Sequence, residues 1–464
     1  MKLYTIVMAA GKGSRMKSLD ESVSKVAYPL LGRPLINYVL KAIEPLQCAR
    51  IVTIVGFGGE TAKSLVQNQC EIAWQTELKG TGHAIMQVAP LLENEVGMTL
   101  IVSGDTPLLQ SETLISLIKR HQDEANDLTI LSAVLDNPFG YGRIIRDGDG
   151  HVKAVVEQAD ANKEQAQVSE INAGVYVFDN QKLFQELKRL KPINKQGEYY
   201  LTDLIAIFNE LGYRVGAQIV TDFTETLGIN DRNQLAEAAK LMRGRINNRL
   251  MKSGVTIEDP DNTYIGPEVV IGQDTVIKPG CYIMGATQIG TANQIGPDTT
   301  IENTTIGHRN KIIKSYITDA SIKDDNAIGP FTHLRGHAEI MNHTRVGNFV
   351  EVKASTIHDG AKAAHLSYLG DTDVDEKANI GCGTITANYD GKNKWKTKIG
   401  KRVFVGSGTT IIAPLTIGDD AFIAAGSTLN QDVPSNDMAI ARARQENKPG
   451  FAKVIRRRID QKAK

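Results

Sequence analysis

Aliphatic residues recur at every sixth position through much of the second half of the chain. The first strict run has isoleucine at seven positions: Ile265, Ile271, Ile277, Ile283, Ile289, Ile295 and Ile301. The period slips by one residue near Ile306, recovers from Ile328, and returns in a late run from Ile399 to Leu429. A period of six fits neither an amphipathic helix nor an alternating strand. It is typical of a parallel β-helix, in which each hexapeptide forms one side of a triangular coil and points its aliphatic side chain inward.

The polar positions of the repeat predict its corners. Glycine follows many of the aliphatic residues, and aspartate or asparagine comes further on. We expect both to serve turns where the backbone needs a positive φ. Two segments break the period, AAHLSYLGDTD and TANYDGKNKWKTK. Because interruptions of a solenoid usually lie on one face, often the binding face, we expect a ligand near them.

The first half has a different pattern. LYTIVMAAGKGSRM reads as a buried strand, a glycine-rich turn and the start of a helix, and RIVTIVG and MTLIVSGD read as further strands. Helical patterns such as SETLISLIKRH lie between them. Alternation of strand and helix predicts an α/β domain, Rossmann-like, with a mostly parallel sheet. A ligand should bind at the carboxyl ends of its strands.

The chain therefore divides into three parts. At 464 residues it is too long for one ordinary core. We predict an α/β domain over residues 1–229, a linking helix over 230–252, and the β-helix with its C-terminal tail over 253–464. The linking helix rests on the pattern NDRNQLAEAAKLMRGRINNRLMKSG, which ends at Gly254.

Composition excludes several classes of function. The 53 basic and 53 acidic residues balance, which gives no electrostatic reason to expect a nucleic-acid or membrane partner. No signal peptide or membrane-spanning run is expected. The four cysteines are scattered without metal-binding or redox spacing. We expect a cytoplasmic protein, and we interpret the basic residues Arg456, Arg457 and Arg458 as part of a solvated terminus.

The glycine-rich turn is a candidate phosphate site. It is neither a Rossmann fingerprint, since Met16 stands where the third glycine would be, nor a Walker A loop. Gly11 and Gly13 still permit close backbone approach to phosphates, and Lys12 and Arg15 add charge. The alternative is an ordinary strand–helix turn. Further along, Asp105 ends an apolar strand, where it is a candidate Mg²⁺ ligand or, alternatively, a helix cap.

A spacing within the repeat points to an anion site. Arg335 and Lys353 are eighteen residues apart, with the period kept between them. Three hexapeptides make one coil, so the two cations should lie one above the other, about 4.8 Å apart at the backbone. Stacked like charges are unfavourable unless an anion lies beside them. A sugar phosphate would fit, and the alternative is two solvated cations on an outward face.

The motifs resemble a known family. MAAGKGSRM, Lys25, QTELKGTGHA and SGD resemble the sugar-1-phosphate nucleotidyltransferases in order and spacing. With YGRI, EINAGVY, QGEYYLTD, LGINDR, VGNFVEVKAS, AAHLSYLGD, NIGCGTITANYDG and FVGSGTTIIAP, nearly the whole chain resembles the bacterial bifunctional N-acetylglucosamine-1-phosphate uridyltransferases and glucosamine-1-phosphate acetyltransferases. The resemblance implies a left-handed β-helix, a homotrimer, and UDP-N-acetylglucosamine synthesis from UTP, acetyl-CoA and glucosamine-1-phosphate, by way of N-acetylglucosamine-1-phosphate.

The resemblance also implies the residues of the first site. Contacts to UTP or UDP-N-acetylglucosamine, in chain order, are implied for Met8, Ala9, Ala10, Gly11, Lys25, Gln75, Gly80, Thr81, Ser103, Gly104, Asp105, Gly142, Glu157, Asn172 and Asn230. Asp105 and Asn230 would be the protein ligands of Mg²⁺. One departure concerns Lys25: the stretch after Met16 is longer than usual, and Ser24 stands where the family has proline.

In the second half the resemblance implies that His365 is the catalytic base of acetyl transfer. Histidine suits this because its imidazole accepts a proton near neutral pH. Arg335, Lys353, Tyr368 and Asn379 would hold the amino-sugar phosphate. Acetyl-CoA contacts are implied for Cys382, where the family usually has alanine, and for Asn388, Tyr389, Ser407, Ala425 and Arg442. We interpret His333, His337 and His343 as non-catalytic, with no metal site, because adjacent hexapeptides lie on different sides of a coil.

Two other functions compete with this reading. One is a single-activity nucleotidyltransferase whose β-helix regulates or oligomerises. It gives no reason for four residues to match the acetyltransferase family together, namely Arg335, Lys353, His365 and Tyr389. A non-enzymatic scaffold should lack Asp105 and an intact QTELKGTGHA segment, and both are present.

Overall fold

A computed structural model describes residues 1–20 and 22–462. The chain forms two compact units, Met1–Arg245 and Ile246–Lys464. The division falls inside the long helix α8 (Arg232–Lys252), which coincides with most of the segment expected to link the domains. No helix among the described residues is long and apolar enough to cross a bilayer.

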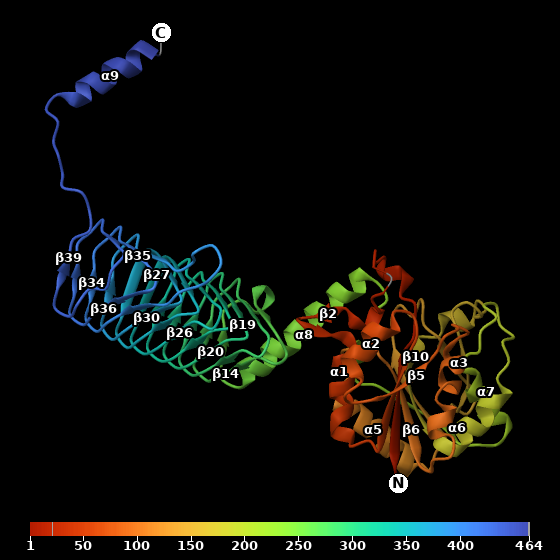
Figure 1. The fold of residues 1–464 in the computed structure, drawn as a ribbon. Helices are drawn as coiled ribbons and strands as arrows, with labels where there is room; N and C mark the ends of the chain where they lie inside the picture. The colour runs from red at the N-terminus through yellow and green to blue at the C-terminus, as the bar shows by residue number, and fades with distance from the viewer. Residues whose placement is uncertain (21, 463–464) are drawn as a thin grey trace. The chain divides into compact units, whose positions relative to one another are not determined.

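The first unit contains a sheet with strand order β11-β7-β10-β6-β1-β4-β5. Its strands β5, β6 and β10 are labelled in Figure 1. β1 pairs in parallel with both β4 and β6, and β10 runs antiparallel between β6 and β7. The predicted, mostly parallel sheet is therefore confirmed. Its antiparallel members are β10 and β9, since β8 pairs antiparallel with both of them. The strands of this unit are β1 (Leu3–Ala9), β2 (Pro29–Leu30), β3 (Arg33–Pro34), β4 (Arg50–Val55), β5 (Glu71–Trp74), β6 (Met98–Ser103), β7 (Leu128–Val134), β8 (Arg143–Arg146), β9 (Val152–Val156), β10 (Glu170–Asp179) and β11 (Val215–Ile219).

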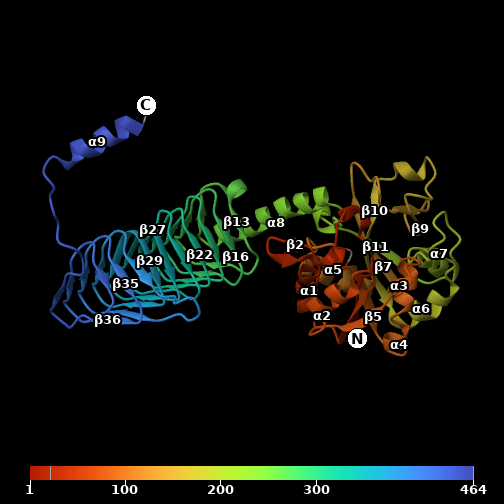
Figure 2. The ribbon, with the colours of Figure 1, turned by 45° about the horizontal axis from the view of Figure 1, so that its top comes forward.

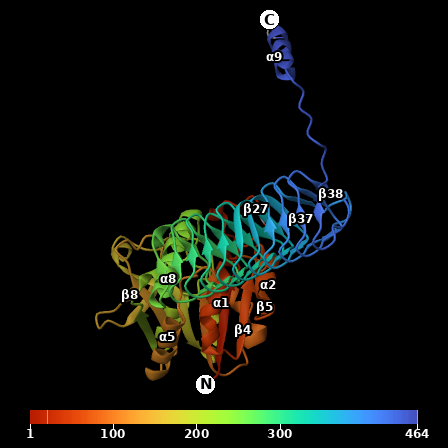
Figure 3. The ribbon, with the colours of Figure 1, turned by 90° about the vertical axis from the view of Figure 1, so that its left-hand side faces the viewer.

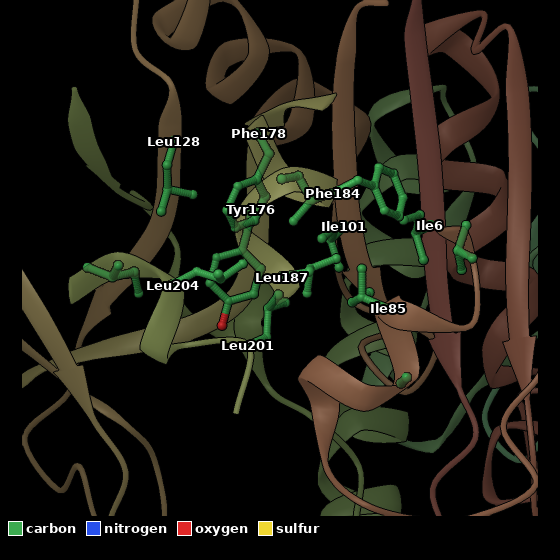
Figure 4. Packing of buried hydrophobic residues seen from close by; sticks show 14 of the residues in the cluster. Ile6, Ile85, Ile101, Leu128, Tyr176, Phe178, Phe184, Leu187, Leu201 and Leu204 are labelled. Carbon is green, nitrogen blue, oxygen red and sulfur yellow. The ribbon is translucent and has the colours of Figure 1, made fainter. Parts of the chain in front are cut away.

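Apolar clusters cover both faces of this sheet. Successive strand residues point to opposite faces, so Ile6 joins one cluster and Val7 the other, and neither is exposed. Figure 4 shows the cluster that contains Ile6, Ile101 and Phe178. Among the residues that the structure describes, the α-helices besides α8 are α1 (Leu35–Ile43), α2 (Gly59–Val66), α3 (Thr81–Met86), α4 (Ala89–Leu92), α5 (Ser111–Asp123), α6 (Asn180–Glu186), α7 (Asp203–Glu210) and α9 (Phe451–Lys462).

The second unit is the predicted parallel β-helix (Figures 2 and 3). Ile265 pairs with Ile283 of the next coil and Ile271 with Ile289, and the four side chains are buried. Isoleucine thus stacks on isoleucine from coil to coil, which is the physical basis of the period of six. Its strands are β12 (Thr256–Ile257), β13 (Tyr264–Ile265), β14 (Val270–Ile271), β15 (Val276–Ile277), β16 (Tyr282–Met284), β17 (Gln288–Ile289), β18 (Gln294–Ile295), β19 (Thr300–Glu302), β20 (Thr305–Ile306), β21 (Lys311–Ile312), β22 (Tyr316–Thr318), β23 (Ser321–Ile322), β24 (Ala327–Ile328), β25 (His333–Arg335), β26 (Glu339–Ile340), β27 (Arg345–Lys353), β28 (Thr356–Ile357), β29 (Lys362–Gly370), β30 (Thr372–Val374), β31 (Asn379–Ile380), β32 (Ile385–Ala387), β33 (Thr397–Ile399), β34 (Phe404–Val405), β35 (Thr410–Ile412), β36 (Leu415–Ile417), β37 (Phe422–Ile423), β38 (Thr428–Leu429) and β39 (Met438–Ala439).

The expected positive φ of the glycines that follow the aliphatic residues is found at Gly296 and Gly329, with φ 98° and 91°, but not at every such glycine. Aspartates such as Asp274 and Asp325 do occupy corners with positive φ, here 61° for both. Gly272 is not among the residues with positive φ, and a Cβ on it would lie 2.8 Å from the backbone of Gly290 in the next coil. Glycine is needed at this position because consecutive coils approach closely, rather than for its φ.

The two breaks in the period differ from each other. The segment AAHLSYLGD forms the long strand β29, which pairs with β27 along most of its length, in a coil that is one residue shorter than eighteen. It is therefore a continuous ladder and not the protruding loop that a break suggests. The second break is a loop between β32 and β33. Asp390 organises it by accepting bonds from the backbone of Asn393 and Lys392 and from Trp395 Nε1, and these bonds lower the pKa of Asp390 to about 2.

A buried histidine in α5 predicts a pH dependence of stability. His121 is 4% exposed, its Nδ1 lies 3.0 Å from Thr129 Oγ1, and burial lowers its pKa to about 4. In the unfolded chain a histidine titrates at about 6.5, so between these values the unfolded state binds the extra proton. The free energy of unfolding should fall as the pH drops from about 6.5 toward 4.

Urea unfolding of the full chain at pH 7.5 and at pH 5 measures this effect. His121→Gln should show a smaller loss of stability at pH 5 than the wild type. The exposed His151, changed in the same way, should leave the wild-type loss unaltered. An equal loss in His121→Gln and the wild type would show that His121 does not carry the effect.

Two candidate active sites

The first unit has a cavity of about 370 Å³ at the carboxyl ends of its parallel strands. Met8 to Gly11 reach it from the end of β1, Gln75 from the end of β5, and Ser103 and Asp105 from the end of β6. The lining residues are Met8, Ala9, Ala10, Gly11, Lys12, Lys25, Val26, Gln75, Leu78, Gly80, Thr81, Ala84, Ser103, Asp105 and Glu198. The structure thus brings together most residues expected at the nucleotide. Gly104 lies behind them and donates its backbone N–H to Met8 O at 2.9 Å.

Gln75 is held in one orientation at the wall of this cavity. The side chain is 4% exposed, and its Nε2 lies 3.1 Å from Gly80 O and 3.2 Å from His83 Nδ1. Gly80 itself has φ 101°, and a Cβ there would lie 2.6 Å from Tyr199 O, so only glycine fits. Because the amide nitrogen is engaged by the protein, the amide oxygen of Gln75 is the atom that remains for a ligand N–H.

Lys25, Asp105 and Asn230 come from three distant segments and meet in one place. The Lys25 ammonium contacts Asp105 Oδ2 and lies 3.0 Å from Asn230 Oδ1. The side chains of Lys25 and Asp105 are mostly buried. Ile229 N donates to Asp105 O at 2.9 Å, which ties the loop of Asn230 to the end of β6. A carboxylate and an amide oxygen that converge on one cation are a ligand set that also suits Mg²⁺.

Ser24, which stands where the family has proline, does not move Lys25 out of the cavity. Ser24 has φ −64°, which is the value that proline imposes. Serine therefore adopts the backbone conformation that proline would have. The longer stretch after Met16 also ends with Lys25 in the cavity.

The residues expected to hold the sugar, Gly142, Glu157 and Asn172, are not among those that line this cavity, and Glu157 forms a second polar group. Glu157 packs against Gly142, whose missing Cβ would lie 3.2 Å from the carboxylate. Thr202 Oγ1 donates to Glu157 Oε1 at 3.2 Å, and burial raises the pKa of Glu157. Thr202 is the residue before α7, yet its hydroxyl does not cap that helix. Thr202 was not predicted as a site residue, although it stands in the segment QGEYYLTD that resembles the family.

In the second unit, the predicted stacking of Arg335 on Lys353 is confirmed by the register of β25 and β27. Each cation also has a carboxylate partner within the protein. Arg335 pairs with Glu351 at 2.6 Å, and Lys353 pairs with Asp371 at 2.9 Å. Each cation is thereby fixed in position, and Lys353 is mostly buried. The two carboxylates were not singled out from the sequence, although Asp371 follows Lys353 by the same eighteen residues.

His365 is exposed on β29, and a neighbouring coil orients it. Its Nδ1 lies 3.0 Å from Asn348 Oδ1, in register across β27 and β29. An amide oxygen only accepts hydrogen bonds, so Nδ1 carries the proton and Nε2 has the free lone pair. Tyr368, three residues on, is in register with Glu351. Asn348 is a further residue that sequence reasoning missed.

The residues expected to bind acetyl-CoA lie on successive coils of the β-helix. Gly408 N donates to Cys382 O at 2.7 Å, and Gly426 N donates to Ser407 O at 2.8 Å. Asn388 donates to Asp371 at the amino-sugar group, whereas Tyr389 is 60% exposed in the loop. Of the other residues expected at acetyl-CoA, Ala425 lies beside Gly406 and Arg442 beside Gly426. Asn379, which was expected at the amino-sugar phosphate, pairs with Lys362 and Phe404.

Comparison with known proteins agrees with both halves. Residues 4–224 match the family described as nucleotidyl transferase, and residues 396–431 match bacterial transferase hexapeptide (six repeats). The bifunctional protein GlmU of Geobacillus thermodenitrificans is 48% identical over 456 residues, which cover 98% of this chain and 99% of that protein. GlmU of an Exiguobacterium species is 47% identical over 98% of this chain and 100% of the relative. GlmU of Listeria welshimeri is 46% identical over 98% of this chain and 99% of that protein. The expected family is confirmed: the chain belongs to the GlmU family of bifunctional proteins.

Proposed function

We propose that the chain catalyses two reactions of UDP-N-acetylglucosamine synthesis: acetylation of glucosamine-1-phosphate in the β-helix, then uridylyl transfer from UTP in the α/β unit. The convergence of Lys25, Asp105 and Asn230 in the cavity of the first unit carries the uridylyl half. The acetyl half rests on the oriented His365 of β29 and on two fixed cations, Arg335 and Lys353, which lie on the neighbouring strands β25 and β27. The single-activity alternative gives no role to that second arrangement.

In the uridylyl site, a phosphate oxygen of N-acetylglucosamine-1-phosphate attacks the α-phosphorus of UTP in line, and the bond to pyrophosphate breaks. Asp105 and Asn230 would hold Mg²⁺, which when bound neutralises charge on the triphosphate. Lys25, which lies between these two oxygens, is placed to turn its ammonium to the phosphates. Gly11 has open space where a Cβ would stand, so its backbone admits a phosphate closely.

Two parts of the site select the substrates. The free amide oxygen of Gln75 accepts the imide N–H of uracil, which cytosine lacks. Glu157, Asn172 and Gly142 hold the amino sugar. A carboxylate accepts bonds from sugar hydroxyls, and the bare Gly142 leaves the space that its Cβ would fill.

In the acetyl site, Arg335 and Lys353 hold the phosphate of glucosamine-1-phosphate. His365 Nε2 takes a proton from the amine as the amine nitrogen attacks the thioester carbon of acetyl-CoA. The carbon–sulfur bond then breaks and coenzyme A leaves as the thiolate. Asn379 lies in register with Lys362 rather than with Tyr368. This separation supports a site completed by a second copy, in a homotrimer. A cytoplasmic location stays a prediction.

We expect Asn348 to affect acetyl transfer only by orienting the imidazole of His365. Asn348→Ala removes the acceptor of the Nδ1 proton, so the ring can rotate and carry its proton on the wrong nitrogen. We expect kcat of acetyl transfer to fall about tenfold or more with KM little changed, because a misplaced base acts on a normally bound substrate. Asn348→Asp keeps an acceptor and should retain most of the activity. Equal kcat in Asn348→Ala and the wild type would contradict this role.

The experiment that tests the proposed function assays the two reactions separately on the full chain. UTP, Mg²⁺ and N-acetylglucosamine-1-phosphate should yield pyrophosphate. Acetyl-CoA and glucosamine-1-phosphate should yield free coenzyme A. Absence of either product would remove the corresponding half of the proposal.

A further inference from the structure

Strand β10 is irregular where it passes the sugar subsite. Its register against β7 shifts between Asn172 and Tyr176, and Gly174 between them has φ 71°. In a regular strand, side chains four residues apart are about 13 Å apart. Here the bulge brings them together, and Asn172 Nδ2 donates to the Tyr176 hydroxyl at 2.6 Å. Bulges next to active sites commonly re-aim a side chain in this way.

Both ends of the Asn172 carboxamide are held by the chain. Gly174 N, which only donates, lies 3.1 Å from Asn172 Oδ1, so it fixes which end is the oxygen. The Tyr176 hydroxyl then accepts from the nitrogen. The backbone N–H of Asn172 is also engaged, by Gly142 O at 2.9 Å. One N–H and one lone pair of the carboxamide remain for a ligand.

Tyr176 is held rigidly in the position from which its hydroxyl contacts the Asn172 carboxamide. It is 4% exposed and belongs to the apolar cluster on one face of the sheet, among Leu187, Leu201 and Leu204 in Figure 4. Burial raises the pKa of its hydroxyl, with a further contribution from the charge of Glu157, so the hydroxyl stays neutral. A polar atom in such a cluster is costly unless it has a specific partner, and Asn172 is that partner.

We propose that Tyr176 is a positioning residue for recognition of the acetamido sugar phosphate, acting through the carboxamide of Asn172. This inference rests on the proposed uridylyl transfer. Without the hydroxyl, Asn172 keeps only its bond to Gly174 and rotates away from the orientation that serves the sugar. The nucleotide contacts of Lys25, Gln75 and Asp105 do not involve Tyr176.

Steady-state kinetics of uridylyl transfer on Tyr176→Phe tests the proposal. We expect KM for N-acetylglucosamine-1-phosphate to rise about tenfold, the effect of one well-placed hydrogen bond. KM for UTP should be unchanged and kcat should stay within about twofold. The matched control is Tyr4→Phe, which removes another buried hydroxyl of the same unit, bonded to Glu95 at 2.9 Å. That variant should leave both KM values unchanged.

A double-mutant cycle separates a specific role from a general loss of structure. In an Asn172→Ala background, Tyr176→Phe should raise KM for the sugar phosphate no further, because its partner is already gone. Equal sugar KM in Tyr176→Phe and the wild type, or an additional rise in the double variant, would overturn the proposal. An inactive wild type would instead refute the proposed function. If Tyr176→Phe does not fold, a sugar-phosphate KM in Asn172→Ala that matches the wild type overturns the proposal on its own.

Discussion

His365→Ala should abolish acetyl transfer and leave uridylyl transfer at the wild-type rate. His365 Nδ1 lies 3.0 Å from a protein acceptor, Asn348 Oδ1, which leaves Nε2 for the substrate, and the strand that carries His365 pairs with the strand of Lys353. Loss of a positioned general base lowers a rate by about 10²–10⁴-fold. The uridylyl site lies in the other compact unit and uses none of these side chains. Release of coenzyme A and of pyrophosphate, measured on the same preparation, checks both halves of this prediction.

His358→Ala is the matched control, because it removes another imidazole from the same β-helix. His358 Nε2 lies 2.7 Å from Asp373, on the coil side that contains β28 and β30. Both activities should survive this change. Acetyl transfer at the wild-type rate in His365→Ala would show that another group takes the proton.

Asp105→Asn should have the reciprocal effect, with uridylyl transfer lowered at least about a hundredfold and acetyl transfer unchanged. The substitution keeps the size of the side chain but removes the charge that meets Lys25 and that would hold Mg²⁺ with Asn230. A metal-assisted step loses charge stabilisation when a carboxylate ligand becomes neutral. Mn²⁺ binding, followed by electron paramagnetic resonance, should weaken in parallel and gives a readout that does not depend on turnover.

Asp123→Asn, an exposed change at the end of α5, is the control for this variant and should alter neither activity nor Mn²⁺ binding. If Asp105→Asn retains wild-type uridylyl transfer and Mn²⁺ affinity, Asp105 is not a metal ligand and acts only as a partner of Lys25.

Much of the β-helix could be predicted because its core is periodic in sequence. Ile265 stacks on Ile283 since each coil repeats the one before it, and the same rule placed Arg335 on Lys353. The rule does not explain Asp371, which is eighteen residues after Lys353, because the residue in register with Lys353 is Gly370. It could not find Asn348 for His365, because that coil is one residue shorter and the pair is seventeen apart.

The first site was predictable from motifs only at its strand ends. Residues such as Gln75 and Asp105 follow apolar strands and meet at one edge of the sheet for topological reasons. Tyr176 and Thr202 are different, because their roles depend on tertiary contacts. A bulge brings Tyr176 to Asn172, and a helix that lacks its usual cap leaves the Thr202 hydroxyl for Glu157. Neither contact has a local sequence signal.

The most direct test of the two-site account supplies one purified preparation with glucosamine-1-phosphate, acetyl-CoA, UTP and Mg²⁺, and measures all products. The account predicts UDP-N-acetylglucosamine, coenzyme A and pyrophosphate in equal amounts. His365→Ala or Asp105→Asn used alone should form no UDP-N-acetylglucosamine, although Asp105→Asn should still release coenzyme A. Mixing these two variants should restore synthesis, because each retains one intact site. Formation of pyrophosphate without coenzyme A release in the wild type would contradict the account and leave a single-activity nucleotidyltransferase.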